Sequence, residues 1–140
     1  MIKKTSLDEF PILENLEKKC FEEEAWNISQ IESHHLLNSS ILYFDNDLKP
    51  TGYIIYLENP FEVEILRIGV LIESRRQGVA QKLLEEVFTI SRNREIILEV
   101  KSENSPAIEL YKKKDFIIFA VRKKYYPDGK DAILMKRHNI

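Results

Sequence analysis

Residues 62–70 read Glu-Val-Glu-Ile-Leu-Arg-Ile-Gly-Val, and residues 75–80 follow with Arg-Arg-Gln-Gly-Val-Ala. The alternation of apolar and polar side chains in the first run predicts a half-buried β-strand. The second run opens a helical pattern, where Gly78 and Ala80 leave little side-chain bulk around the first backbone N–H groups. Such groups, together with the helix dipole, bind anions such as a pyrophosphate. A helix start that packs closely on a neighbour needs the same small residues, so this pattern alone leaves both interpretations open.

The segments around this turn predict a strand–helix–strand–helix unit. Residues 78–91 carry apolar side chains at helical spacing, residues 96–100 form an apolar strand, and residues 106–113 form a short helix. A strand, a helix and a second strand in this order predict a parallel crossover at the centre of a sheet. Two further strands, at about residues 116–122 and 132–136, are predicted at the end of the chain.

The N-terminal half predicts helices followed by a hairpin. A short strand at residues 2–5 precedes a helix whose apolar stripe ends at Phe21, and Ser29 with Glu32 forms a capping-box pattern that opens a second helix. Residues 41–44 and 52–57 then predict two strands that continue into the strand at residues 62–70. We therefore expect an α/β fold with a mixed, mostly antiparallel central sheet, one parallel pair and about four flanking helices.

Composition excludes several classes of protein. The 140 residues carry 21 Lys and Arg against 23 Asp and Glu, a net charge of −2, which argues against a protein that wraps nucleic acid. Cys20 is the only cysteine, which excludes an internal disulfide and a cysteine-cluster metal site. No repeat, linker, leader-like segment or run of 18 apolar residues occurs. We expect one domain over residues 1–140, in the cytoplasm, with no metal and no membrane contact.

Two side chains have catalytic potential. Glu99 interrupts an apolar strand and faces away from Leu98 and Val100, where partial burial would raise its pKa and suit a general base. The alternative is that Glu99 has no catalytic role and faces solvent or pairs with a lysine. Tyr111 lies one turn beyond Ala107 in the short helix, where it is either a core aromatic or a proton donor for a leaving group.

The order of these features resembles the GNAT superfamily of acetyl-CoA-dependent N-acetyltransferases. The pattern Arg75-x-x-Gly78-x-Ala80 is similar to that superfamily's acyl-CoA motif, Gln/Arg-x-x-Gly-x-Gly/Ala. Residues 68–70, 98–100, 104–111 and 125–135 together resemble the bacterial ribosomal-protein alanine N-acetyltransferase family. Members of that family acetylate the N-terminal amine of a small-subunit ribosomal protein. This combination of segments is more specific than the acyl-CoA motif alone.

The resemblance implies acetyl-CoA as cosubstrate. As acceptor it implies the N-terminus of a ribosomal protein with a small first residue. Glu99 would be the proton acceptor and Tyr111 the proton donor. A bulge near residues 68–70 would free a backbone N–H for the developing oxyanion. Acceptor contacts would come from Trp26, Tyr125 and Tyr126. Cofactor contacts would come from Ile68, Gly69, Val70, Arg75, Arg76, Gln77, Gly78, Val79, Ala80, Gln81 and Asn104.

Three departures from the family pattern bear on this expectation. Arg67 stands where the family usually has Asn, Leu71 and Ile72 replace Asp-Pro, and Lys130 replaces Glu. The changes at Arg67 and Lys130 leave the acceptor preference open. One alternative is therefore the same transfer to a small-molecule amine or a lysine. Another is a non-catalytic acyl-CoA-binding module, against which the presence of both Glu99 and Tyr111 argues.

Overall fold

The secondary structure follows the predicted order over residues 1–21 and 39–139, which the computed structural model describes. The predicted helix at residues 29–36 lies outside these residues, as does Trp26. Short 3-10 turns lie at Leu7–Glu9 and Ile72–Ser74. The helices are α1 (Phe10–Phe21), α3 (Val79–Ile90) and α4 (Ser105–Lys113). The strands are β1 (Ile2–Lys4), β2 (Ser39–Phe44), β3 (Pro50–Glu58), β4 (Glu62–Val70), β5 (Arg94–Lys101), β6 (Ile117–Arg122) and β7 (Ala132–Asn139).

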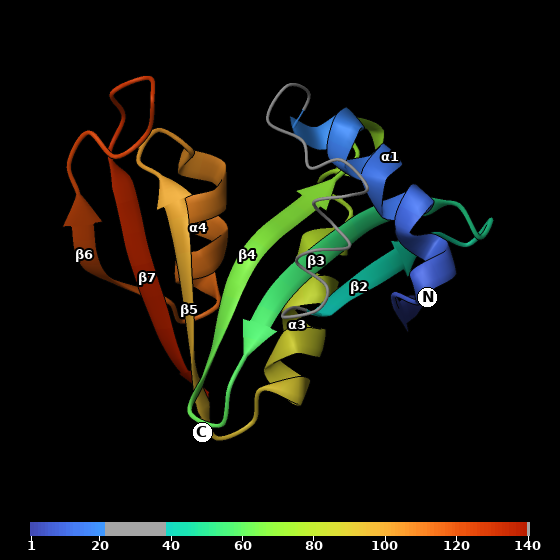
Figure 1. Cartoon of the computed structure of the whole chain (residues 1–140), viewed down its shortest axis with the longest axis horizontal. Helices are drawn as coiled ribbons and strands as arrows, with labels where there is room; N and C mark the ends of the chain where they lie inside the picture. Colours follow the sequence, from blue (N-terminus) through green and yellow to red (C-terminus); the bar gives the residue numbers. More distant parts are fainter. Residues whose placement is uncertain (22–38, 140) are drawn as a thin grey trace.

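Seven strands form one sheet in the order β1-β2-β3-β4-β5-β7-β6 (Figure 1). All neighbouring strands are antiparallel except β4 and β5, which are parallel and joined by the crossover through α3. The mixed, mostly antiparallel sheet with one parallel pair is therefore confirmed. None of the helices within the described ranges is long and apolar enough to cross a bilayer.

The parallel pair is short, and this opens the sheet in its middle. Pairing between β4 and β5 runs only from Glu62 opposite Glu95 to Ile65 opposite Leu98. Beyond this point each strand keeps its other neighbour, because β4 stays paired with β3 and β5 stays paired with β7. The two strands therefore diverge toward their carboxyl ends, as Figure 1 shows.

A β-bulge in β4 lies where the divergence begins. Ile55 of β3 pairs with Arg67 and Tyr56 pairs with Ile65, so Leu66 is an extra residue on β4. Leu66 and Arg67 consequently both face α1, whereas Ile65 and Ile68 pack on the opposite side of the sheet. A bulge was expected near residues 68–70; it lies in the same strand two residues earlier, at Leu66, and residues 68–70 themselves keep a regular register with β3.

Each face of the sheet has its own hydrophobic core. On one face, the buried apolar side chains of α3 and Tyr111 of α4 pack against β3, β4, β5 and β7. On the other face, Phe10, Leu13 and Leu16 of α1 pack against β2 and β3. The amphipathic stripe of each helix explains why it covers a sheet face. The core that contains α3 spans both β4 and β5, and it therefore lies on one face of the sheet beside the opening.

A buried polar cluster fixes α1 to the sheet beside the opening. The Tyr53 hydroxyl of β3 donates a hydrogen bond to Oε1 of Glu17, a fully buried carboxylate, at 2.6 Å. The Nε atom of Arg67 lies 3.5 Å from the same oxygen, and its guanidinium lies 4.4 Å from the centre of the Phe21 ring. Burial, and then the charge of Glu17, raise the pKa of Tyr53 far above its usual range.

Candidate active site

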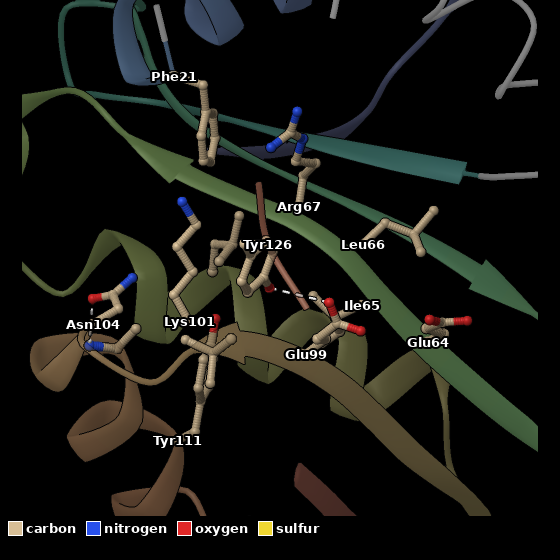
Figure 2. Close-up of a pocket in the computed structure, with 13 residues that line it drawn as sticks. Phe21, Glu64, Ile65, Leu66, Arg67, Glu99, Lys101, Asn104, Tyr111 and Tyr126 are labelled. Carbon is tan, nitrogen blue, oxygen red and sulfur yellow. Dashed lines mark hydrogen bonds between the residues drawn. The ribbon is translucent and has the colours of Figure 1, made fainter. Parts of the chain in front are cut away.

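The opening between β4 and β5 holds a cleft of about 490 Å³ (Figure 2). Its walls come from the diverging strands, from α4, from the end of α1 and from the loop between β6 and β7. The lining residues are Phe21, Glu64, Ile65, Leu66, Arg67, Ile68, Glu99, Val100, Lys101, Asn104, Ala107, Tyr111 and Tyr126. Five of the residues expected at a functional site are among them: Ile68, Glu99, Asn104, Tyr111 and Tyr126.

Glu99 follows Leu98, the last residue of β5 that pairs with β4, and its side chain lines the cleft. Leu98 and Val100 on either side of it are buried in the core, as strand alternation predicted. The Glu99 side chain is 28% exposed. Its Oε1 accepts a hydrogen bond from the Tyr126 hydroxyl at 3.1 Å, and its Oε2 lies 3.6 Å from Nη1 of Arg122. The carboxylate is thus half-buried and within reach of a ligand in the cleft.

Tyr111 enters the cleft from α4, and it is also a core residue. It is buried, and its ring makes an edge contact with Phe116 at a centroid distance of 5.6 Å. Burial raises the pKa of Tyr111 to about 12. The hydroxyl therefore stays protonated at neutral pH, which is the form that can donate a proton or a hydrogen bond. Tyr111 is therefore a core aromatic residue whose hydroxyl is also placed to donate a proton, so both interpretations from the sequence can hold for it.

The turn before α3 has an unusual backbone at two of the expected cofactor residues. Gly78 is the N-cap residue with φ +79°, and Arg76 has φ +64°. A Cβ atom added at Gly78 would meet nothing within 4 Å, so the backbone is open to solvent there. No side chain caps this end of the helix. Open backbone at an uncapped helix start fits an anionic ligand.

The remaining residues of this turn divide between surface and core. Arg75 holds the end of β4, because its Nε donates to the carbonyl oxygen of Val70 at 3.0 Å. Arg76, Gln77 and Gln81 are exposed, Ala80 is half-buried, and Val79 is buried in the core.

The glycine at position 69 has a packing explanation. A Cβ atom there would lie 2.6 Å from the Tyr53 ring, so a larger residue would displace a buried aromatic side chain. Gly69 and Val70 do not line the cleft, whereas Ile68 does.

Asn104 combines a structural contact with a place in the cleft. It is the N-cap residue of α4, where its Oδ1 accepts a hydrogen bond from the backbone N–H of Ala107 at 3.3 Å. The carboxamide nitrogen is the group left to donate to a ligand. The hydrogen bond to a cofactor that the resemblance implied would therefore be donated by that nitrogen.

The two tyrosines expected to contact the acceptor have different positions. Tyr126 lines the cleft, while Tyr125 does not and is 50% exposed. Their rings meet edge-on at a centroid distance of 5.2 Å. Trp26, the third expected acceptor contact, lies outside the described residues.

Three charged residues of the cleft were not identified as site residues from the sequence: Glu64, Arg67 and Lys101. Glu64 shares a sheet face with Glu99, and its pKa is raised by burial and by the charges of Glu62 and Glu99. The Glu-Val-Glu alternation of residues 62–64 signals that face, but the register with β5 was needed to bring it to Glu99. Within residues 1–21 and 39–139, no group of three His, Cys, Asp or Glu side chains could hold a metal ion.

Lys130, one of the departures from the family pattern, lies outside the cleft. Its Nζ pairs with Glu103 at 3.5 Å, between two half-exposed side chains. This pair connects the loop before β7 with the segment that leads into α4.

Comparisons with known protein sequences agree on a family. The model of the acetyltransferase (GNAT) family matches residues 5–116. An N-alpha-acetyltransferase of Saccharolobus solfataricus is 47% identical over 77 residues, which cover 52% of this chain and 46% of that protein. The ribosomal protein bS18 alanine N-acetyltransferase of Escherichia coli is 36% identical over 80 residues, which cover 53% of this chain and 54% of that protein. The chain thus spans about half the length of the curated relatives it matches.

Comparison with solved structures extends the similarity to nearly the whole chain. The crystal structure of the ribosomal-protein-S18-alanine N-acetyltransferase from Escherichia coli has a TM-score of 0.89 at 26% identity. It covers 99% of this chain and 92% of that chain. The crystal structure of Ard1 from Thermoplasma volcanium has a TM-score of 0.87 at 26% identity, and covers 99% of this chain and 96% of that chain.

Proposed function

Because the chain belongs to the GNAT acetyltransferase family, we propose that it transfers an acetyl group from acetyl-CoA to the N-terminal amine of a protein. Residues 1–140 act as one catalytic domain in this proposal. The observation that carries it is the opening between β4 and β5, where a carboxylate and a buried tyrosine hydroxyl line one cleft. The names of the relatives favour an N-terminal amine as the acceptor.

The fit of acetyl-CoA is supported at two places. The left-handed backbone at Gly78, with open space in front of it, leaves N–H groups at the start of α3 accessible to a pyrophosphate. The divergence of β4 from β5 leaves room for the pantetheine arm. When bound, acetyl-CoA supplies a thioester whose carbonyl carbon is open to attack by an amine. Ile68 and Asn104 then flank the arm from β4 and from the start of α4.

In this proposal Glu99 accepts a proton from the amine and Tyr111 donates a proton to the leaving sulfur. An N-terminal ammonium, with a pKa of about 8, must lose a proton before its nitrogen can attack, and Glu99 accepts that proton directly or through a water. The new C–N bond forms as the C–S bond breaks, and the nitrogen releases its second proton to solvent. Tyr111, protonated because its pKa is about 12, donates a proton to the leaving sulfur and regains one from solvent. The products are an acetylated amine and a free thiol.

The acceptor is an extended peptide whose first nitrogen enters the cleft toward Glu99. In this proposal it lies between the loop that contains Trp26 and the loop that contains Tyr125 and Tyr126. A free α-amine is selected because an Nα-blocked peptide has no nucleophile at its end. A small first residue, and a ribosomal protein as the natural acceptor, are proposed from the relatives.

A thiol-release assay tests this function. Acetyl-CoA is supplied with peptides that begin with Ala, Ser, Thr or Met, and separately with free lysine and spermidine. We expect release with Ala- and Ser-initiated peptides and none with their Nα-acetylated forms. Faster turnover of spermidine or lysine would assign a small-molecule amine as acceptor. Binding of acetyl-CoA without release of thiol on any acceptor would indicate a non-catalytic module.

A further inference from the structure

The carboxylate of Glu99 is held from one side by the C-terminal hairpin. Its Oε1 accepts a hydrogen bond from the Tyr126 hydroxyl at 3.1 Å, drawn as the dashed line in Figure 2. Its Oε2 lies 3.6 Å from Nη1 of Arg122, at the end of β6. Each oxygen therefore meets a different partner. A carboxylate held at both oxygens has a restricted orientation about its terminal bond.

Tyr126 is itself fixed before any ligand binds. Its backbone N–H donates to the carbonyl oxygen of Lys130, and its own carbonyl accepts from the N–H of Gly129. Gly129 has φ +81°, the left-handed conformation that this tight turn requires. The Nζ atom of Lys101 lies 4.9 Å from the centre of the Tyr126 ring and 3.4 Å from Asp128 of the same loop. The hydrogen-bonded turn thus holds the Tyr126 hydroxyl next to Glu99.

We propose that Tyr126 is a positioning residue for Glu99: its hydroxyl orients the carboxylate for proton acceptance, with Arg122 as the second support. This inference rests on the proposed function, in which Glu99 is the proton acceptor. It changes the role expected for Tyr126, because the hydroxyl engages the base where an acceptor contact was anticipated. Tyr125, with its ring half-exposed, remains the acceptor contact of this pair.

The groups around Glu99 show what the Tyr126 hydroxyl contributes. Glu64 faces Glu99 from β4, Arg122 from β6 and Tyr126 from the loop. Lys101 lies two residues along β5, and the residue opposite Glu99 on β7 is the apolar Leu134. Loss of the Tyr126 hydroxyl removes the hydrogen bond to Oε1, so the orientation of the carboxylate becomes less restricted.

The test is Tyr126→Phe, measured by steady-state acetylation of an Ala-initiated peptide at neutral pH. We expect kcat to fall about 10-fold. KM for acetyl-CoA stays unchanged. In a Glu99→Gln background the same substitution has no further effect, since Tyr126 acts through Glu99. Tyr43→Phe is the control, because it removes a hydroxyl that contacts Lys82 outside the cleft and should leave kcat unchanged.

Two results would overturn the inference. They are a rise in KM for peptide with kcat unchanged in Tyr126→Phe, or an equal loss of kcat in the Glu99→Gln background. A readout without turnover separates this inference from the proposed function. The ¹³C resonance of the Glu99 side-chain carboxyl, recorded at neutral pH, changes its chemical shift in Tyr126→Phe if the hydroxyl holds it, whether or not any peptide is acetylated. An unchanged chemical shift overturns the positioning role alone.

Discussion

At the scale of single residues, Tyr111 shows how one side chain serves both the core and the cleft. Its ring packs against Phe116 in the core that contains α3, while its hydroxyl reaches the opening between β4 and β5. The position needs an aromatic ring for packing and, in the proposed function, a hydroxyl for proton donation. These two requirements can be separated by a substitution that removes only the oxygen atom.

We expect Tyr111→Phe to lower kcat by about 100-fold, the lower end of the range for general acids. The free energy of unfolding, measured in urea, changes by less than about 1.5 kcal/mol because the ring is retained. The wild type keeps its acid up to about pH 10, since the pKa of Tyr111 is about 12 and the hydroxyl ionises only above that range. Equal kcat values for the two proteins would make Tyr111 a packing residue only.

From the sequence alone, Glu99 and Tyr111 could be named as candidate catalytic residues, but the residues that surround them in the structure could not. Glu99 and Tyr111 were recognisable because a carboxylate in an apolar strand and a tyrosine at helical spacing are visible locally. Glu64 was not recognised, because its approach to Glu99 depends on the parallel register of two strands about 30 residues apart. Gly69 is predicted to contact the cofactor through its backbone, and the structure adds a packing reason for this glycine, because an added Cβ would lie 2.6 Å from the Tyr53 ring.

At the scale of elements, the start of α3 is the feature that a cofactor would use. Gly78 caps the helix in a left-handed conformation that Asn and Asp also tolerate. Both residues are favourable N-caps, so either substitution preserves α3. They have nearly the same shape and differ in charge, which makes them a matched pair for testing an anion site.

We expect Gly78→Asp to weaken CoA binding at least 10-fold more than Gly78→Asn, since only Asp repels a pyrophosphate. Isothermal titration calorimetry at low ionic strength measures both dissociation constants. Similar thermal unfolding midpoints for the two variants would show that α3 is intact in each. Equal affinities of the two variants for CoA would place the pyrophosphate away from this turn.

The packing of α1 on the sheet is the second element-scale feature, and sequence could not predict it. Glu17 and Arg67 are 50 residues apart, and nothing in the helical stripe of α1 indicates that a carboxylate at position 17 is fully buried. The bulge at Leu66 is what turns Arg67 toward α1. Arg67, a departure from the family pattern, is therefore accommodated by Glu17 and Phe21.

We expect Glu17→Ala to lower the free energy of unfolding by about 3–5 kcal/mol, because it leaves the Arg67 charge and the Tyr53 hydroxyl buried without this partner. Urea denaturation followed by circular dichroism measures the loss. Glu14→Gln is the control, since it weakens a partly exposed pair with Lys18 and should cost less than about 1 kcal/mol. A similar small loss in both variants would contradict the structural role of Glu17.

At the scale of the whole molecule, the sheet has an opening between β4 and β5 and a separate hydrophobic core on each face. The sheet is continuous through β3 and through β7, and it opens only where β4 leaves β5 after four paired residues. The core with α3 and α4 lies on one face and the core with α1 on the other. The order of elements was predictable from periodicity, because each strand and helix has its own pattern. The length of the parallel pairing was not, since it is decided by the bulge and by competing pairing with β3 and β7.

The central claim is that this cleft acetylates a protein N-terminus with Glu99 as proton acceptor. The direct measurement is mass spectrometry of a peptide that begins with Ala and contains one internal lysine, after incubation with acetyl-CoA. We predict acetylation of the α-amine only, and a rate about 100-fold lower in Glu99→Gln with CoA binding retained. Acetylation of the lysine side chain in preference to the α-amine, or equal rates for the wild type and Glu99→Gln, would contradict the claim.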